Sequence, residues 1–117
     1  MSNFVNCTPH PIVVRKSDGS EVTFAPSGIV PRLSSETYGI GSFDGIELRR
    51  TRFGEVEGLP KWEHEGTMLI VSGMILDAVK RGDLVAPDTG PSAIRDSSGR
   101  IIAVTGFRKA DSGGLWG

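Results

Sequence analysis

The stretch TMLIVSGMILDAVKRG, residues 67–82, decides the fold of this chain. Thr67–Val71 is an almost unbroken apolar run, which is typical of a central strand covered on both faces. Ser72 can cap a following helix of about ten residues, because apolar side chains then recur at helical spacing. Those side chains belong to Met74, Ile75, Ala78 and Val79. Lys80 and Arg81 suit the last turn of this helix, and Gly82 ends it.

Short β-forming runs surround this strand and helix. Before it, Phe4–Cys7, Ile12–Arg15, Glu21–Ala25, Ile29–Leu33 and Ile46–Phe53 are rich in apolar and β-branched residues. The turn residues Ser17–Ser20 and Asp44–Gly45 predict hairpins at two of the breaks. After the helix, Leu84–Ala86 predicts a short strand, and Ile94–Arg95 leads through Asp96–Gly99 into Ile101–Phe107 as a final hairpin. The sequence predicts an α+β fold: an antiparallel β-meander or sheet, one main helix and a C-terminal β-hairpin.

Composition limits the class of protein. With 117 residues, the chain fits a single domain, 1–117. Its 13 Lys and Arg against 14 Asp and Glu give a net charge of -1, which argues against binding to long nucleic acids. The single cysteine, the absence of a recognisable secretory signal and the absence of a run of about 20 apolar residues predict a cytoplasmic protein that does not enter a membrane.

Residues for catalysis or metal binding are few. His10 carries an imidazole, which is a common general base, and Cys7 lies three positions before it, but a rigid turn and a buried thiol explain both residues at least as well. An acidic cluster is formed by Glu55, Glu57, Glu63, His64 and Glu65. Because its spacing follows no metal-binding loop, a solvated loop is the favoured interpretation. We therefore expect no enzyme activity, no metal and no cofactor.

The pattern favours anion binding instead. The small residues of the loop Asp88, Thr89, Gly90, Pro91 and Ser92 would let backbone N–H groups approach a phosphate, and Arg95 could clamp it. An ordinary turn is the alternative, since no phosphate-loop motif is present. Phe107 could stack on a base beside Arg108, and Arg32 repeats the pairing of an arginine with apolar neighbours.

The order of several motifs resembles small proteins of phages and prophages. They are TPHPI (8–12), APSG (25–28) with the following Arg32, RFGEVEGLP (52–60), LIVS (69–72), LVAP (84–87), IRDSSGRIIAV (94–104) and GF (106–107). Within that group the chain is most similar to the Thoeris anti-defence type 1 proteins, which sequester cyclic ADP-ribose isomers. The resemblance implies a cyclic nucleotide ligand that is not cleaved, with cyclic oligonucleotides as a further ligand class, and a homo-oligomer built from dimers into a hexamer.

The same resemblance implies roles for individual residues. Arg32 and Arg108 would hold the diphosphate, and the pocket loop would be 88–92. The family's stacking aromatic near the end of the helix has no clear counterpart, which leaves Phe107 or Trp62 for that role.

Two other functions remain open. One is a nucleotide hydrolase or lyase with His10 as base and Asp88 or Glu55 as its partner. The other is a structural or protein-binding phage component that assembles through its strand edges and the tail residues Leu115 and Trp116.

Overall fold

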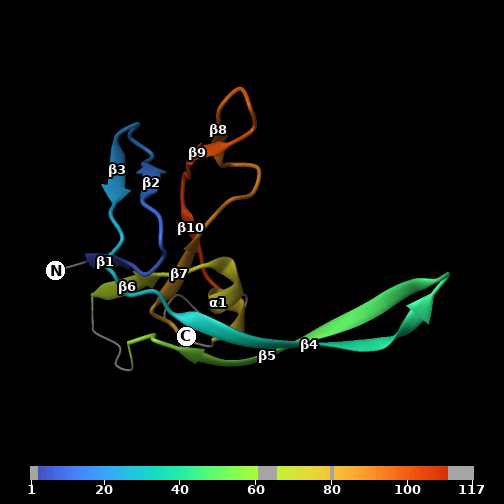
Figure 1. Ribbon diagram of the computed structural model, residues 1–117. Helices are drawn as coiled ribbons and strands as arrows, with labels where there is room; N and C mark the ends of the chain where they lie inside the picture. The colour runs from blue at the N-terminus through green and yellow to red at the C-terminus, as the bar shows by residue number, and fades with distance from the viewer. Residues whose placement is uncertain (1–2, 61–65, 80, 111–117) are drawn as a thin grey trace.

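The computed structural model describes residues 3–60, 66–79 and 81–110 (Figure 1). It contains β1 (Asn3–Asn6), β2 (Ile12–Arg15), β3 (Glu21–Phe24), β4 (Arg32–Phe43), β5 (Ile46–Glu57), β6 (Thr67–Ile70), α1 (Gly73–Ala78), β7 (Leu84–Pro87), β8 (Ile94–Arg95), β9 (Ile101–Ala103) and β10 (Phe107–Arg108). Most strand pairs are antiparallel and the helix is short, which confirms the predicted α+β class.

The central sheet has four strands in the order β1-β6-β7-β10. β1 and β6 are parallel, as are β6 and β7, and only β10 runs antiparallel to its neighbour β7. This differs from the continuous antiparallel meander that the short strands suggest. The reason is that β6 reaches β7 through α1, and a strand, helix and strand joined in this way return in the same direction.

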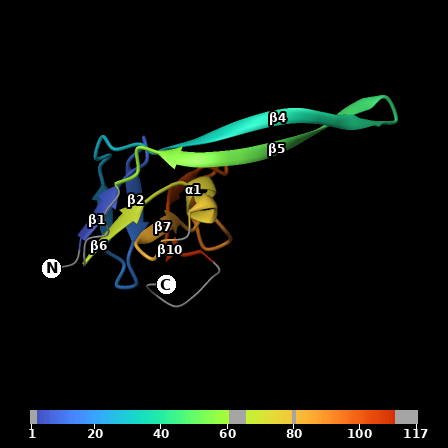
Figure 2. The ribbon, with the colours of Figure 1, turned by 90° about the horizontal axis from the view of Figure 1, so that it is seen from below.

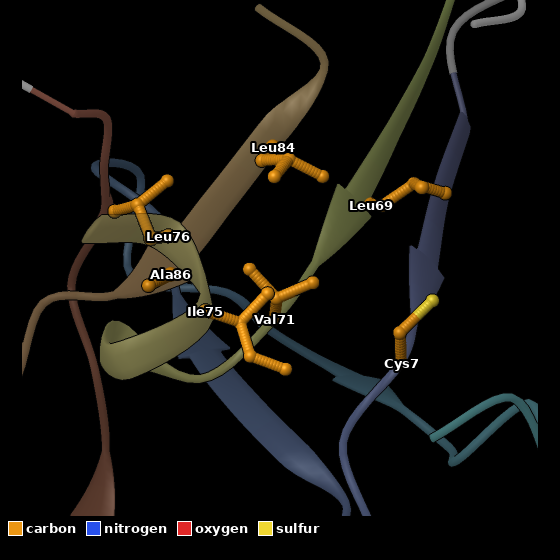
Figure 3. Packing of buried hydrophobic residues seen from close by; sticks show 7 residues of the cluster. All are labelled: Cys7, Leu69, Val71, Ile75, Leu76, Leu84 and Ala86. Atoms are coloured by element: carbon orange, nitrogen blue, oxygen red, sulfur yellow. The ribbon is translucent and has the colours of Figure 1, made fainter. Parts of the chain in front are cut away.

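Helix α1 covers one face of this sheet. Ser72 caps it as predicted, its hydroxyl accepting a hydrogen bond from the Ile75 N–H at 3.4 Å. The helix has six residues rather than about ten, because Val79 is already extended and Arg81 turns away to bind both carboxylate oxygens of Asp83. Figure 3 shows Ile75 and Leu76 lying over the strands among the buried side chains of the core. The other members are Cys7, Leu69, Val71, Leu84 and Ala86.

Two hairpins rise from the opposite side of the sheet (Figure 1). β2 pairs with β3 through the predicted Asp18–Gly19 turn, and β8 pairs with β9 through the predicted turn at 96–99. The hairpins join where Val104 pairs with Val14. The predicted strand Ile101–Phe107 is divided here into β9 and β10, because Val104 turns to β2 and the Gly106 carbonyl accepts a hydrogen bond from the Asp88 N–H.

Strands β4 and β5 form a long arm (Figure 2). Each strand has 12 residues, and the predicted turn at Asp44–Gly45 joins them. The strand predicted at Ile29–Leu33 instead starts at Arg32 and continues to Phe43, since pairing with β5 extends a segment whose serines and glycines are poor strand formers. The arm explains a radius of gyration of 16.8 Å, where about 13 Å is typical of a compact chain this long.

No helix in the described part of the chain is long and apolar enough to cross a membrane.

Candidate functional site

An open apolar groove of about 240 Å³ lies between the two hairpins. Its walls come from β2, β9 and the residues next to them: Pro11, Ile12, Val13, Ile101, Ile102, Ala103 and Val104. Pro87 and Thr89 line the groove where β7 ends. Ile102 is 51% exposed and Ile101 39%, so this wall is open to solvent. The groove offers an apolar surface at the start of the predicted anion-binding loop.

The loop Asp88–Ser92 is a hydrogen-bonded turn. Asp88 donates its N–H to Gly106, and its carboxylate accepts the N–H of Gly90 at 3.0 Å. The N–H of Ala93 is bonded to the Gly90 carbonyl. Because Pro91 has no N–H, the backbone donors that no described hydrogen bond uses in this loop are those of Thr89 and Ser92. An ordinary turn therefore explains the small residues of this loop. Only two backbone N–H groups of the loop are left to bind a phosphate.

Arg95 joins this loop to the β8–β9 hairpin. Its Nη1 donates to the Gly99 carbonyl at 2.8 Å and its Nη2 to the Thr89 carbonyl at 3.5 Å. A guanidinium carries five N–H donors, so three remain for a ligand. Arg95 is exposed, and its contact with Thr89 places a positive charge next to the mouth of the apolar groove. The groove and Arg95 together form the candidate binding site.

Phe107 and Arg108 point to opposite faces of the central sheet. The Phe107 ring lies 5.1 Å from that of Phe4 and 6.2 Å from that of Phe24, on the side of the hairpins. Phe107 therefore packs against two other aromatic rings, which is the alternative to its predicted role in stacking on a base. Arg108 lies on the helix side, where its Nη1 is 3.4 Å from an Asp77 oxygen.

The helix approaches Arg108 closely at Gly73. A Cβ added there would lie 2.7 Å from the Arg108 Nη2, so Gly73 leaves room for this guanidinium. Arg108 and Asp77 are both exposed, and solvent weakens their attraction.

Arg32 lies at the root of the arm. It is exposed and faces Glu57 in the register of the β4–β5 ladder. No hydrogen bond or ion pair among the described residues joins it to Arg108 or to the 88–92 loop. Within one chain, Arg95 contacts the predicted loop, whereas Arg32 lies on β4 opposite Glu57 and Arg108 lies on β10 beside Asp77.

The residues considered for catalysis have structural partners. Asn6 is 2% exposed, and its Nδ2 donates to the carbonyls of His10 at 2.8 Å and Phe24 at 2.9 Å. Its Oδ1 accepts the N–H and the hydroxyl of Thr8. Burial raises the pKa of the Cys7 thiol above its ordinary value, and a weaker opposing effect comes from its hydrogen bond with Ser27. The turn containing His10 thus has a structural explanation, and Cys7 is kept in its unreactive thiol form.

Metal ligands are not gathered in the structure. Among the described residues, no three His, Cys, Asp or Glu side chains are close enough to hold an ion. Glu55 and Glu57 lie on β5, whereas Glu63, His64 and Glu65 fall outside the described residues. Trp62, Leu115 and Trp116 also fall outside them.

The groove walls and Asn6 were not among the candidates from the sequence. Two consecutive isoleucines after a Gly-Arg turn were the only signal for the groove, and they look like ordinary strand residues. Asn6 sits in an apolar run and its role depends on Phe24, 18 positions away. Neither assignment could be made before the hairpins were placed.

No protein-family profile matches the chain, and searches among curated proteins and solved structures also found no match.

Proposed function

We propose that this protein binds and sequesters a small cyclic nucleotide signal without cleaving it. The observation that carries the proposal is the apolar groove that ends at Thr89, beside the exposed guanidinium of Arg95. An apolar wall suits a nucleotide base, and a cation at its end suits a phosphate. The resemblance to Thoeris anti-defence type 1 proteins adds the ligand class, a cyclic ADP-ribose isomer, and a role in the cytoplasm of an infected bacterium.

The size of the groove refines the proposal. Pockets for drug-sized ligands occupy roughly 300–1,000 Å³, which exceeds the volume of about 240 Å³ found here. One groove therefore accommodates the base and part of a ribose, with the phosphates outside against Arg95. Tight binding would need further contacts, and these would come from a neighbouring subunit in a homo-oligomer.

Titration calorimetry with cyclic ADP-ribose isomers tests the proposal, with linear ADP-ribose for comparison. We expect saturable binding and recovery of the intact cyclic ligand after the protein is heat-denatured. Arg95→Gln should weaken binding about tenfold or more, because a charge-assisted hydrogen bond typically contributes about 1.5–3 kcal/mol. Arg95→Lys should have an intermediate effect, since it keeps the charge but loses the fork.

Arg49→Gln is the matched control, because this exposed arginine lies on the arm and pairs with Glu47. It should leave the affinity unchanged. Absence of binding, or equal effects of Arg95→Gln and Arg49→Gln, would contradict the proposed site. Unfolding midpoints of all variants should be measured, since Arg95 also holds two backbone carbonyls.

The same titration separates two further alternatives. A loss of affinity in Arg32→Gln or Arg108→Gln would mean that a second subunit brings these arginines to the ligand. If the unmodified protein releases a cleaved ligand and His10→Ala releases the intact one, the hydrolase would be favoured instead. His10 directly precedes the groove residue Pro11.

A further inference from the structure

The tip of the arm has two chemically different faces. Residues that pair across an antiparallel ladder share a face, and every second residue along a strand lies on that face. Phe43 pairs with Ile46, and Gly41 with Leu48, which places Phe43, Ile46 and Leu48 together near the tip. Phe43 is 75% exposed and Ile46 67%, although both are large apolar residues. Such side chains would be expected to have a partner.

The other face of the arm is polar near its tip. The hydroxyls of Thr37 and Thr51 lie 3.1 Å apart, and Arg49 is paired with Glu47. Further toward the tip, Ser42 pairs with Glu47. Alternation of this kind is found in sheets that bury one face. The arm shows it while standing clear of the body (Figures 1 and 2).

A two-stranded ribbon is marginally stable by itself in water. β4 and β5 pair only with each other among the described strands, so each has an outer edge of backbone donors and acceptors without a strand beside it. Three or more strands are usually needed for such a sheet to be independently stable. The arm therefore gains most from a strand added along one edge.

The two edges are protected to different degrees. β5 carries six charged residues among its twelve, which is how natural edge strands avoid pairing. β4 carries only Arg32 and Glu36 and has no proline. The edge that is open to another strand is therefore that of β4.

We propose that this edge pairs with β4 of a second copy of the chain. The two β4 strands would run antiparallel about a twofold axis, giving a four-stranded ribbon in the order β5-β4-β4-β5. With Arg32 of one copy opposite Asp44 of the other, Phe43 of each copy would lie opposite Leu33 of its partner, so each apolar tip would lie beside an apolar residue at the root of the other arm.

Opposite charges at the two ends of β4 favour a second copy in the antiparallel orientation. Arg32 lies at the root of β4, and Asp44 follows its tip in the turn. Antiparallel pairing brings the root of each arm to the tip of the other, so that Arg32 meets Asp44 at both ends. A parallel arrangement would place like charges together. The extra residue at Ile40, where the ladder shifts register, adds twist, so the arms would coil around each other.

Sedimentation equilibrium of the full chain without ligand gives the first test. We expect a dimer at about micromolar concentration. Phe43→Lys combined with Ile46→Lys should weaken it at least tenfold, because each tip would then bring two charges against the apolar Leu33 of its partner. Ser42→Lys, on the other face of the tip, is the control and should have a much smaller effect.

Single cysteines test the pairing itself. The centre of an arrangement that pairs Arg32 with Asp44 is Tyr38, so the two Tyr38→Cys residues would face each other across adjacent strands about 4.8 Å apart. This separation allows a disulfide to form under oxidised glutathione. Thr37→Cys tests an arrangement in which the twofold axis lies one residue closer to the root of the arm. The native Cys7 is buried, which keeps it out of the reaction.

Arg50→Cys and Thr51→Cys are the matched controls, because they pair with Tyr38 and Thr37 on β5. In the proposed ribbon each would lie three strand spacings, roughly 14 Å, from its copy. We expect a covalent dimer from at least one β4 variant and from neither β5 variant.

Three outcomes would overturn the proposal: a monomer at about 100 μM, crosslinking through β5, or a dimer that none of the four cysteines links. No ligand is used in these experiments, so their result is independent of nucleotide binding. Failure of nucleotide binding would leave the dimer intact, and failure of the dimer would leave the groove and Arg95 to be tested separately.

Discussion

The body and the arm of this protein use the same β-ladder but differ in what covers it. In the body, Leu76, Leu84 and Val71 are fully buried in the core between α1 and the sheet. In the arm, Phe43 and Ile46 remain mostly exposed. Hydrogen bonds are formed in both regions, so the difference lies in apolar burial, which is the main favourable contribution to folding. The body should therefore hold nearly all the stability of one chain, and the arm should open locally.

The largest expected difference comes from one leucine in each region. Leu76→Ala should lower the free energy of unfolding by about 2–5 kcal/mol, because it leaves a cavity under α1. Leu48→Ala, which truncates a leucine that is 44% exposed, should change it by less than about 0.5 kcal/mol. Urea denaturation of dilute protein measures both. Equal costs would show that the arm belongs to the cooperative core.

A buried polar residue provides the second comparison. Asn6→Ala should cost about 2–3 kcal/mol, since it leaves the carbonyls of His10 and Phe24 and the N–H of Thr8 without their partner. Asn3→Ala, at an exposed position of the same strand, is the control and should be nearly neutral. If both variants unfold at the same urea concentration, the network around Asn6 does not hold β1 to β3.

Two turn glycines, one in the body and one in the arm, test the difference in stability between these regions with the same Gly→Ala substitution. Gly19 and Gly45 have φ values of 90° and 77°, and neither has an atom near the position of an added Cβ. Gly19→Ala should destabilise the body by about 1–2 kcal/mol because of backbone strain alone. Gly45→Ala should leave global unfolding unchanged in dilute protein and increase hydrogen exchange along β4 and β5. A loss of global stability in Gly45→Ala would contradict local opening of the arm.

The smallest effect concerns the β2–β3 turn at acid pH. The hydroxyl and N–H of Ser20 lower the pKa of the Asp18 carboxyl below its ordinary value. A lowered folded-state pKa stabilises the protein above the unfolded-state pKa, near 3.8, and this contribution is lost as pH falls through the folded-state value.

Asp18→Asn should therefore reduce stability slightly at pH 7 and by less at pH 2, in urea titrations at low salt. Asp44→Asn in the arm's turn is the control and should leave body unfolding unchanged at both values. A larger effect of Asp18→Asn at pH 2 than at pH 7 would reverse the expected sign.

Much of the fold follows from local residue patterns. The strand that begins at Thr67, the helix start after Ser72, the Asp18–Gly19 turn and the Asp44–Gly45 turn are all where the sequence predicts them. Local signals of this kind depend on residues a few positions apart. The helix end could not be predicted, because it depends on Arg81 turning to Asp83 and to the carbonyl of Pro60, 21 residues earlier.

In the candidate site, too, some features follow from neighbouring residues and others depend on the tertiary structure. The loop 88–92 and Arg95 are adjacent in sequence and adjacent in the fold. Phe107 and Arg108 are consecutive, yet their side chains lie on opposite faces of the sheet, since strand residues alternate. The β-strand period predicts that separation, but it does not say which face carries the groove.

By itself the sequence determined the class of fold, its turns and the loop beside which a ligand is proposed to bind, because these depend on neighbouring residues. Only the tertiary structure decided that β1, β6 and β7 are parallel, that Pro11 and Ile102 line one groove, and that β4 and β5 leave the body as an arm. Those outcomes depend on which surfaces remain uncovered once all segments are packed, and no local pattern contains that information.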